Sequence, residues 1–202
     1  GAPRGALSHD RAALDDLARA ASGKLLVFVF FLDGFDLKIA DAFARTHERS
    51  RADEAQAVVQ QIEAMGRRAV ALPLDVAQSK HFAEFAATLK RTLQATWGRA
   101  QFDCLINNAG LGVHALFADT TEAQFDDMVA MHLKGPFFLT QALLPLIADG
   151  GRILNVSSGL ARFAMPGYGA YASMKGGVEV LTRYLAKELG ARRIAVNVIA
   201  PG

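Results

Sequence analysis

Tyr171 and Lys175 lie four residues apart in the run YASMK (171–175), which follows a glycine-containing loop. Positions i and i+4 share one face of an α-helix, so on a helix the two side chains point into the same space. A free phenol has a pKa near ~10 and is a poor base at neutral pH. An ammonium group beside it favours the phenolate and lowers that pKa, so this spacing predicts acid–base chemistry by Tyr171.

The same spacing also arises without any chemistry, as a surface tyrosine beside a solvated lysine. Tyr168 offers an internal comparison, because residue 172 is alanine and Tyr168 therefore has no lysine four positions later. The choice between the two readings depends on what the rest of the chain places around Tyr171.

Strand-like and helix-like segments alternate along the chain. The segments that predict strands are continuous apolar runs, at 24–31, 68–76, 102–110, 151–158 and 193–202. Those that predict helices lie at 51–66, 79–96, 121–147, with an interruption near Gly135 and Pro136, and 168–190. Continuous apolar strands separated by helices predict a parallel sheet covered by helices on both faces, which is a doubly wound α/β fold.

Ligands of such sheets bind beyond the carboxyl ends of the strands. The chain places distinctive residues where four of these apolar runs end: Asp75, NNAG at 107–110, Ser158, and Pro201 with Gly202. The sequence therefore predicts that these residues meet at one edge of the sheet.

Composition limits the class of protein. The chain has 202 residues, of which 51% are hydrophobic and 21% charged, and its net charge is +2, so nothing favours nucleic acid or an anionic membrane as a partner. Its single cysteine, Cys104, excludes an internal disulfide and lies in an apolar run.

The longest apolar run, 25–32, has the length of a strand and is too short to span a membrane. The N-terminus lacks the basic, apolar and small-residue segments of a signal peptide, so we expect a cytoplasmic protein. The histidines show no ligand spacing and predict no metal site.

Several motifs in order carry a resemblance to a known family. They are LDV (74–76), NNAG (107–110), NVSSG (155–159), YASMK (171–175) and NVIAPG (197–202). With these motifs the chain from about residue 51 to 202 resembles the short-chain dehydrogenase/reductase family. Ser158 precedes Tyr171 by thirteen residues, which is the family's spacing for its catalytic serine.

The resemblance implies a role for each matched residue in an NAD- or NADP-dependent oxidoreductase. Tyr171 would exchange a proton with the oxygen of a small carbonyl or alcohol substrate, and Ser158 would hydrogen-bond that oxygen. Lys175 would lower the pKa of Tyr171 and bind the ribose hydroxyls. The remaining cofactor contacts would come from Asp75 and Val76 at the adenine, and from Asn108, Ala109, Gly110, Pro201 and Gly202. Asn107 and Gly110 have an alternative role in shaping a turn.

The resemblance also implies an assembly and a choice of cofactor. Apolar stretches within 121–147 and 168–190 exceed what the sheet covers, so we expect a homodimer or homotetramer. Arg49 and Arg51 favour NADP over NAD, since arginine pairs with a 2′-phosphate. We expect Phe163, Met165 and Tyr168 to edge an apolar substrate pocket.

His132 is one departure from the family pattern. It stands in the long helix where the family has an asparagine that completes a proton relay. Histidine donates, accepts and titrates near neutrality, so a modified relay is one hypothesis. A packed helix residue without a catalytic role is the other.

The first fifty residues depart further. Placing 22–45 on the family's glycine loop makes Gly34 the second glycine, whereas Phe30 and Asp36 replace the first and third. Phe30 then fills space that the phosphates need and Asp36 adds negative charge, which predicts weak binding of NADH and NADPH. A rival placement uses 1–7 as the glycine loop and 24–32 as the second strand.

The sequence therefore predicts an N-terminal extension over 1–23 and one Rossmann-like domain over 24–202. Relative to the family, the second strand and the C-terminal part of the fold are expected to be absent. Two hypotheses of function remain: an oxidoreductase, and a non-catalytic protein of the same fold that serves as a binding or interaction module. A sugar-nucleotide epimerase or dehydratase is disfavoured, because such chains are longer and carry a second domain.

Overall fold

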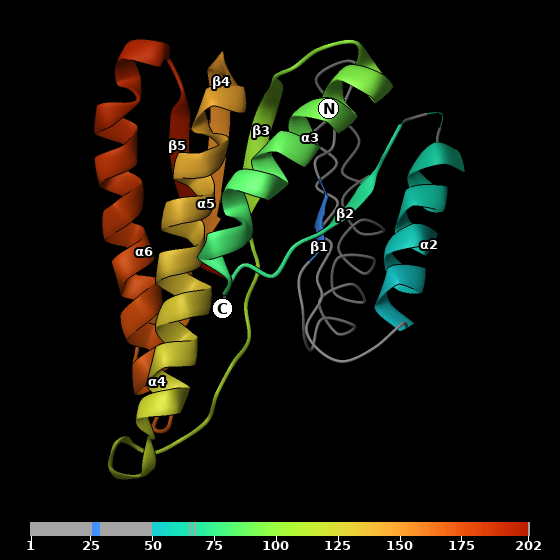
Figure 1. Ribbon diagram of the computed structural model, residues 1–202. Helices are drawn as coiled ribbons and strands as arrows, with labels where there is room; N and C mark the ends of the chain where they lie inside the picture. The colour runs from blue at the N-terminus through green and yellow to red at the C-terminus, as the bar shows by residue number, and fades with distance from the viewer. Residues whose placement is uncertain (1–25, 29–49, 65, 67, 202) are drawn as a thin grey trace, which may run out of the picture. The chain divides into compact units, whose positions relative to one another are not determined.

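The computed structural model describes residues 26–28, 50–64, 66 and 68–201 (Figure 1). These residues belong to two compact units, which divide between Leu74 and Asp75. The expected extension over 1–23 and its boundary with the domain lie outside the described residues.

The first unit contains strand β1 (Leu26–Phe28), helix α2 (Ser50–Ala64) and strand β2 (Ala71–Pro73). α2 buries Val59 and Ile62, which pack with Ala69, so the amphipathic pattern of 51–66 is confirmed. β1 and β2 pair antiparallel, with Val27 opposite Leu72. The expectation that all strands run parallel is therefore wrong for this pair. An apolar run indicates burial but not direction, because direction depends on the path of the chain between the two strands.

The second unit is built on a three-stranded parallel sheet in the order β3-β4-β5. Its strands are β3 (Phe102–Asn107), β4 (Ile147–Val156) and β5 (Ala195–Ile199). Leu105 pairs with Ile153, and Ile153 pairs with Val196, all three of which are buried. The predicted parallel arrangement is confirmed for this sheet.

Helices connect these strands. They are η1 (Ser79–His81), α3 (Phe82–Trp97), η2 (Phe117–Asp119), α4 (Glu122–Val129), the π-helical turn η3 (Ala130–Lys134), α5 (Gly135–Leu143), η4 (Leu144–Leu146), η5 (Gly159–Ala161), α6 (Gly169–Glu188) and η6 (Gly190–Arg192). In Figure 1, α5 lies between α3 and α6 in front of the sheet of the second unit, and α3 runs at an angle to the other two helices. Among the described residues, no helix is both long and apolar enough to cross a membrane.

The helix expected over 121–147 is broken by the π-helical turn Ala130–Lys134. Pro136 lacks the N–H that would bond to the carbonyl of residue 132 in an α-helix. A Cβ on Gly135 would lie 2.6 Å from the Val76 carbonyl oxygen, so only glycine lets this backbone approach. The predicted interruption is confirmed, and β4 begins at Ile147, where the helix was expected to end.

A buried polar network joins the sheet to two helices. The Asn107 amide donates to Thr140 at 3.0 Å and to Asn155 at 2.8 Å, and the Asn155 amide donates to Thr182 at 2.8 Å. Asn155, Thr140 and Thr182 are buried. We call these four residues the Asn155 network; it fixes β3 and β4 against α5 and α6.

Candidate active site

Ser158 and Tyr171 meet through their hydroxyl groups. Ser158 follows β4 and caps η5, where its Oγ accepts a hydrogen bond from the Leu160 N–H at 3.2 Å. The hydroxyl of Ser158 also hydrogen-bonds to Tyr171 on the first turns of α6. With the Leu160 N–H at one acceptor position, the Ser158 hydroxyl keeps its proton and a second acceptor position available for the phenol. The pair predicted from the thirteen-residue spacing is thus in contact.

Lys175 is buried one turn after Tyr171. Its Nζ donates to the Val156 carbonyl at 2.7 Å and lies 5.6 Å from the centroid of the Tyr171 ring. Only 4% of Lys175 is exposed, and burial lowers its pKa to about 8. The two side chains therefore share a face of α6, as their spacing predicted.

The pKa of Tyr171 moves in the direction opposite to the one predicted from the sequence. Burial raises the pKa of this phenol, and the hydrogen bond from Ser158 opposes the rise without cancelling it. The prediction counted the charge of Lys175 and left out the loss of water around the phenolate. Desolvation is the largest influence on this pKa, since burial disfavours the charged form of any acid.

His132 lies between Tyr171 and the loop after β3. Its Nε2 is 2.7 Å from the Leu111 carbonyl oxygen, and its ring stands edge-on to the Tyr171 ring with centroids 5.0 Å apart. A Cβ on Gly110 would lie 2.9 Å from the His132 Cε1. Only 1% of His132 is exposed, so it is a packed residue that also touches the predicted acid–base residue. The structure thus gives both hypotheses for His132 a physical basis.

The residues of NNAG divide into one that points inward and three that line the strand end. Asn107 is the last residue of β3, and its side chain belongs to the Asn155 network, which supports a structural role. Asn108, Ala109 and Gly110 follow β3 and are half-buried. Small side chains at the carboxyl end of a parallel strand leave room for a flat ligand.

The other predicted cofactor contacts lie in tight turns. Asp75 Oδ1 accepts from the Ala77 N–H at 3.0 Å, and Val76 is buried. The Pro201 carbonyl accepts from the Gly159 N–H at 2.9 Å, so Pro201 lies beside the turn that follows Ser158. Outside the described residues lie Phe30, Gly34, Asp36, Arg49 and Gly202, and also the side chain of Arg51.

The described residues fit the nicotinamide end of a dinucleotide. Asn108 to Gly110, Ser158 and Pro201 follow the carboxyl ends of three adjacent parallel strands. An ammonium group has three N–H donors, and the contact of Lys175 with Val156 uses one of them. Lys175 therefore retains donors suited to ribose hydroxyls. Among the described residues, no cluster of three histidine, cysteine or acidic side chains is arranged to hold a metal ion.

An apolar groove of about 670 Å³ lies near these residues. Its lining includes Leu116, Phe117, Phe125, Met165 and Ser173. Of the residues expected to edge the substrate pocket, Met165 lines this groove, whereas the Tyr168 ring packs edge-on against His114. Ser158, Tyr171, Lys175 and His132 are not part of its lining.

Two residues near the site were missed from the sequence. Glu179 binds Ser157 beside the site, and Asn155 centres the buried network. Glu179 follows Lys175 by four residues, so the i, i+4 spacing that identified Lys175 was also a signal for Glu179. Asn155 lies in NVSSG, a motif that does not indicate which way the Asn155 side chain points.

Known proteins resemble this chain over most of its length. A family model described as short chain dehydrogenase matches residues 33–202. An uncharacterized oxidoreductase of Methylorubrum extorquens is 32% identical over 187 residues, which are 89% of this chain and 73% of the relative. The 3-oxoacyl-[acyl-carrier-protein] reductase FabG of Staphylococcus epidermidis is 34% identical over 152 residues, 74% of this chain and 60% of the relative.

A solved structure extends the likeness to three dimensions. The landomycin C-6 ketoreductase LanV with bound NADP and rabelomycin has a TM-score of 0.73 and 38% identity, and the match covers 77% of this chain and 64% of LanV. The chain thus spans less than two thirds of FabG and of LanV. The Rossmann-like α/β fold is confirmed. The chain belongs to the short-chain dehydrogenase/reductase family.

Proposed function

We propose that this protein is a nicotinamide-dependent oxidoreductase that interconverts a carbonyl and an alcohol, with NADP as the preferred cofactor. The observation that carries the proposal is the hydrogen bond between Ser158 and Tyr171, with buried Lys175 one helical turn away. LanV, which was solved with NADP, supports the choice of cofactor, as do Arg49 and Arg51 in the sequence.

The hydroxyls of Ser158 and Tyr171 form the binding site for the substrate oxygen. When bound, the nicotinamide supplies or accepts a hydride at the substrate carbon. The raised pKa keeps Tyr171 protonated at neutral pH, so in the direction of reduction the phenol is ready to donate its proton to the substrate oxygen. Ser158 stabilises the phenolate that remains, because its hydroxyl can donate to that oxygen.

Lys175 and His132 support Tyr171 from two sides. Lys175 binds the ribose hydroxyls. With a pKa of about 8 it is mostly protonated at neutral pH, and it then places a positive charge beside Tyr171. His132 holds the ring of Tyr171 by edge-to-face packing and is itself held by the Leu111 carbonyl. In this role His132 replaces the relay asparagine by orienting the tyrosine.

The protein acts as a homodimer or homotetramer in this proposal. Large apolar side chains on and near α4, α5 and α6 are exposed: Phe117, Phe125, Phe137, Phe138, Val180 and Tyr184. Phe137 and Phe138 pack edge-on against each other, and the apolar groove lies beside Phe117 and Phe125. A second copy of the chain would cover these residues, and a monomeric mass by light scattering at micromolar concentration would overturn this assembly.

A fluorescence titration with NADPH and NADH tests the function, followed by an assay of NADPH oxidation with 9,10-phenanthrenequinone as the carbonyl probe. We expect NADPH to bind more tightly than NADH, and Tyr171→Phe to remove the oxidation but not the binding. If neither nucleotide binds, even after Phe30→Gly and Asp36→Gly, the alternative of a non-catalytic binding module is favoured.

A further inference from the structure

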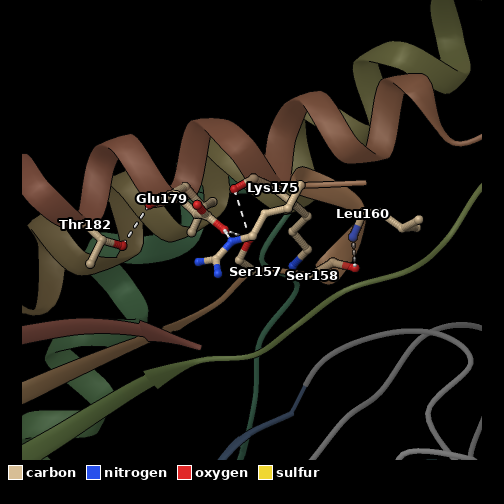
Figure 2. A network of polar contacts seen from close by, with 8 residues as sticks. Ser157, Ser158, Leu160, Lys175, Glu179 and Thr182 are labelled. Carbon is tan, nitrogen blue, oxygen red and sulfur yellow. Dashed lines mark hydrogen bonds and ion pairs between the residues drawn. The ribbon is translucent and has the colours of Figure 1, made fainter. Parts of the chain in front are cut away.

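Glu179 contacts the segment that carries Ser158 on both of its sides. Its Oε1 lies 2.9 Å from the Ser157 hydroxyl, directly before Ser158, and 3.7 Å from the Arg162 Nε, just after η5. Figure 2 shows Ser157 and Ser158 next to α6, close to Lys175 and Glu179. The Glu179 side chain is 18% exposed, whereas that of Arg162 is 67% exposed, so solvent weakens the ion pair and the bond to Ser157 is the stronger contact.

The Ser157 hydroxyl is shared between two acceptors on α6. It lies 2.9 Å from the Glu179 carboxylate and 3.3 Å from the Lys175 carbonyl oxygen. A serine hydroxyl has one proton, and a carboxylate is the stronger acceptor, so the bond to Glu179 is the main one. Glu179 thereby sets the distance between α6 and the backbone of Ser157.

Other contacts hold this segment to the sheet and do not replace Glu179. The Ser157 N–H donates to the Ile199 carbonyl at 2.7 Å, and the Gly159 N–H donates to the Pro201 carbonyl at 2.9 Å. Both bonds run to β5 or to the residues after it. Besides the Ser158–Tyr171 bond itself, the described contacts that tie the segment to α6 come from the Lys175 ammonium at Val156, from Ser157 and from Glu179.

We propose that Glu179 is a positioning residue for the Ser158–Tyr171 pair, since its carboxylate binds Ser157, directly before Ser158, and so holds this segment against the helix that carries Tyr171. Its meaning for catalysis rests on the proposed oxidoreductase function. The geometric effect itself does not, because the hydroxyls of Ser158 and Tyr171 meet without cofactor or substrate.

The chain is well suited to a direct test, because it has three tyrosines: Tyr168, Tyr171 and Tyr184. Labelling tyrosine with ¹³C at the ring carbon that bears the hydroxyl gives one NMR line for each, assigned by changing each tyrosine to phenylalanine. Ser158→Ala shows where the Tyr171 line moves when its hydrogen bond is lost. The experiment needs no cofactor and no turnover, so it is decided separately from the proposed function.

Glu179→Ala should move the Tyr171 line toward its position in Ser158→Ala. We expect more than half of the displacement that Ser158→Ala produces relative to the wild type, and no movement of the Tyr184 line. Glu179→Gln should restore most of the original position, because an amide oxygen still accepts from Ser157. The control is Glu188→Ala, the same change at an exposed position of α6, which should move none of the three lines.

Ser157→Ala gives the same test from the other side and keeps Glu179 with Arg162. It should reproduce the displacement seen in Glu179→Ala. The proposal would be overturned if the Tyr171 line stayed in place in Glu179→Ala. If Glu179→Ala fails to fold, an unmoved Tyr171 line in Ser157→Ala would overturn it instead. An equal displacement in Glu188→Ala would do the same, because it would show that the line responds to any loss of charge on α6.

Discussion

The ring of His132 stands edge-on to the ring of Tyr171, with centroids 5.0 Å apart and 86° between the ring planes. His132 reaches this position from the π-helical turn, where its Nε2 also meets the Leu111 carbonyl. The turn after β3 and Tyr171, the proposed acid–base residue on α6, are therefore connected through one buried side chain. A change on either side of His132 should reach Tyr171.

Gly110→Ala tests that coupling. The new Cβ would lie 2.9 Å from His132 Cε1 and 3.4 Å from its Nδ1, so the ring must shift toward Tyr171 or the loop must move. We expect a loss of about 1–3 kcal/mol in the free energy of unfolding and lower turnover. Gly112→Ala is the matched control, since nothing lies within 4 Å of its Cβ. Urea unfolding and the NADPH assay measure both effects, and similar results from the two variants would show that His132 does not transmit the change.

Tyr171→Phe should reduce turnover by at least ~100-fold, since it removes the proposed proton donor and leaves the ring in place. NADPH binding and the unfolding midpoint should change little. Tyr168→Phe is the control: its ring packs against His114 and it has no lysine four residues later. Comparable losses of turnover in both variants would contradict an acid–base role that is specific to Tyr171.

Lys175 should make stability depend on pH in a defined direction. Burial lowers its pKa to about 8 in the folded chain, whereas an unfolded lysine titrates near ~10.4. Between these values the unfolded state binds more protons, so stability rises as the pH rises. Relative to Lys175→Met, the wild type should gain roughly 2 kcal/mol between about pH 8 and about pH 10.

The measurement is urea unfolding of both proteins across this pH range, and the difference between them cancels the other groups that titrate. A difference that stays constant with pH, or that falls, would show that the buried Lys175 does not have a lowered pKa.

Asn155→Ala should cost about 2–3 kcal/mol in the free energy of unfolding, because Asn107 and Thr182 each lose a partner in the interior. Asn197→Ala, on the exposed side of β5, should cost far less. Thermal or urea unfolding compares the two. Similar costs would mean that the Asn155 network adds little beyond ordinary strand packing.

The double change Phe30→Gly and Asp36→Gly should strengthen NADPH binding. If Asp36 takes the third glycine's place, its charge lies close to the cofactor phosphates, and a like-charge contact at ~4 Å costs on the order of a few kcal/mol. That penalty corresponds to roughly a hundredfold in affinity. Tight binding by the unchanged chain in a fluorescence titration would show that the placement of 22–45 on the glycine loop is wrong.

Much of the site was predictable because it depends on local spacing. Tyr171 and Lys175 share a face of α6 since they are four residues apart, and the parallel strands β3, β4 and β5 were predicted from their continuous apolar runs. The residues after those strands gather at one edge of the sheet because parallel strands end on the same side. These features follow from helix and strand periods alone.

The tertiary structure decided what depends on burial and on contacts between distant residues. The Asn107–Asn155 bond joins positions 48 residues apart, and Ser157 and Glu179 are 22 apart, so no local pattern predicts either contact. The antiparallel pairing of β1 and β2 likewise depended on the chain path between them. The raised pKa of Tyr171 could not be predicted from the sequence for the same reason. The spacing predicts that a charged lysine lies near Tyr171, whereas desolvation depends on all the residues that pack around the phenol.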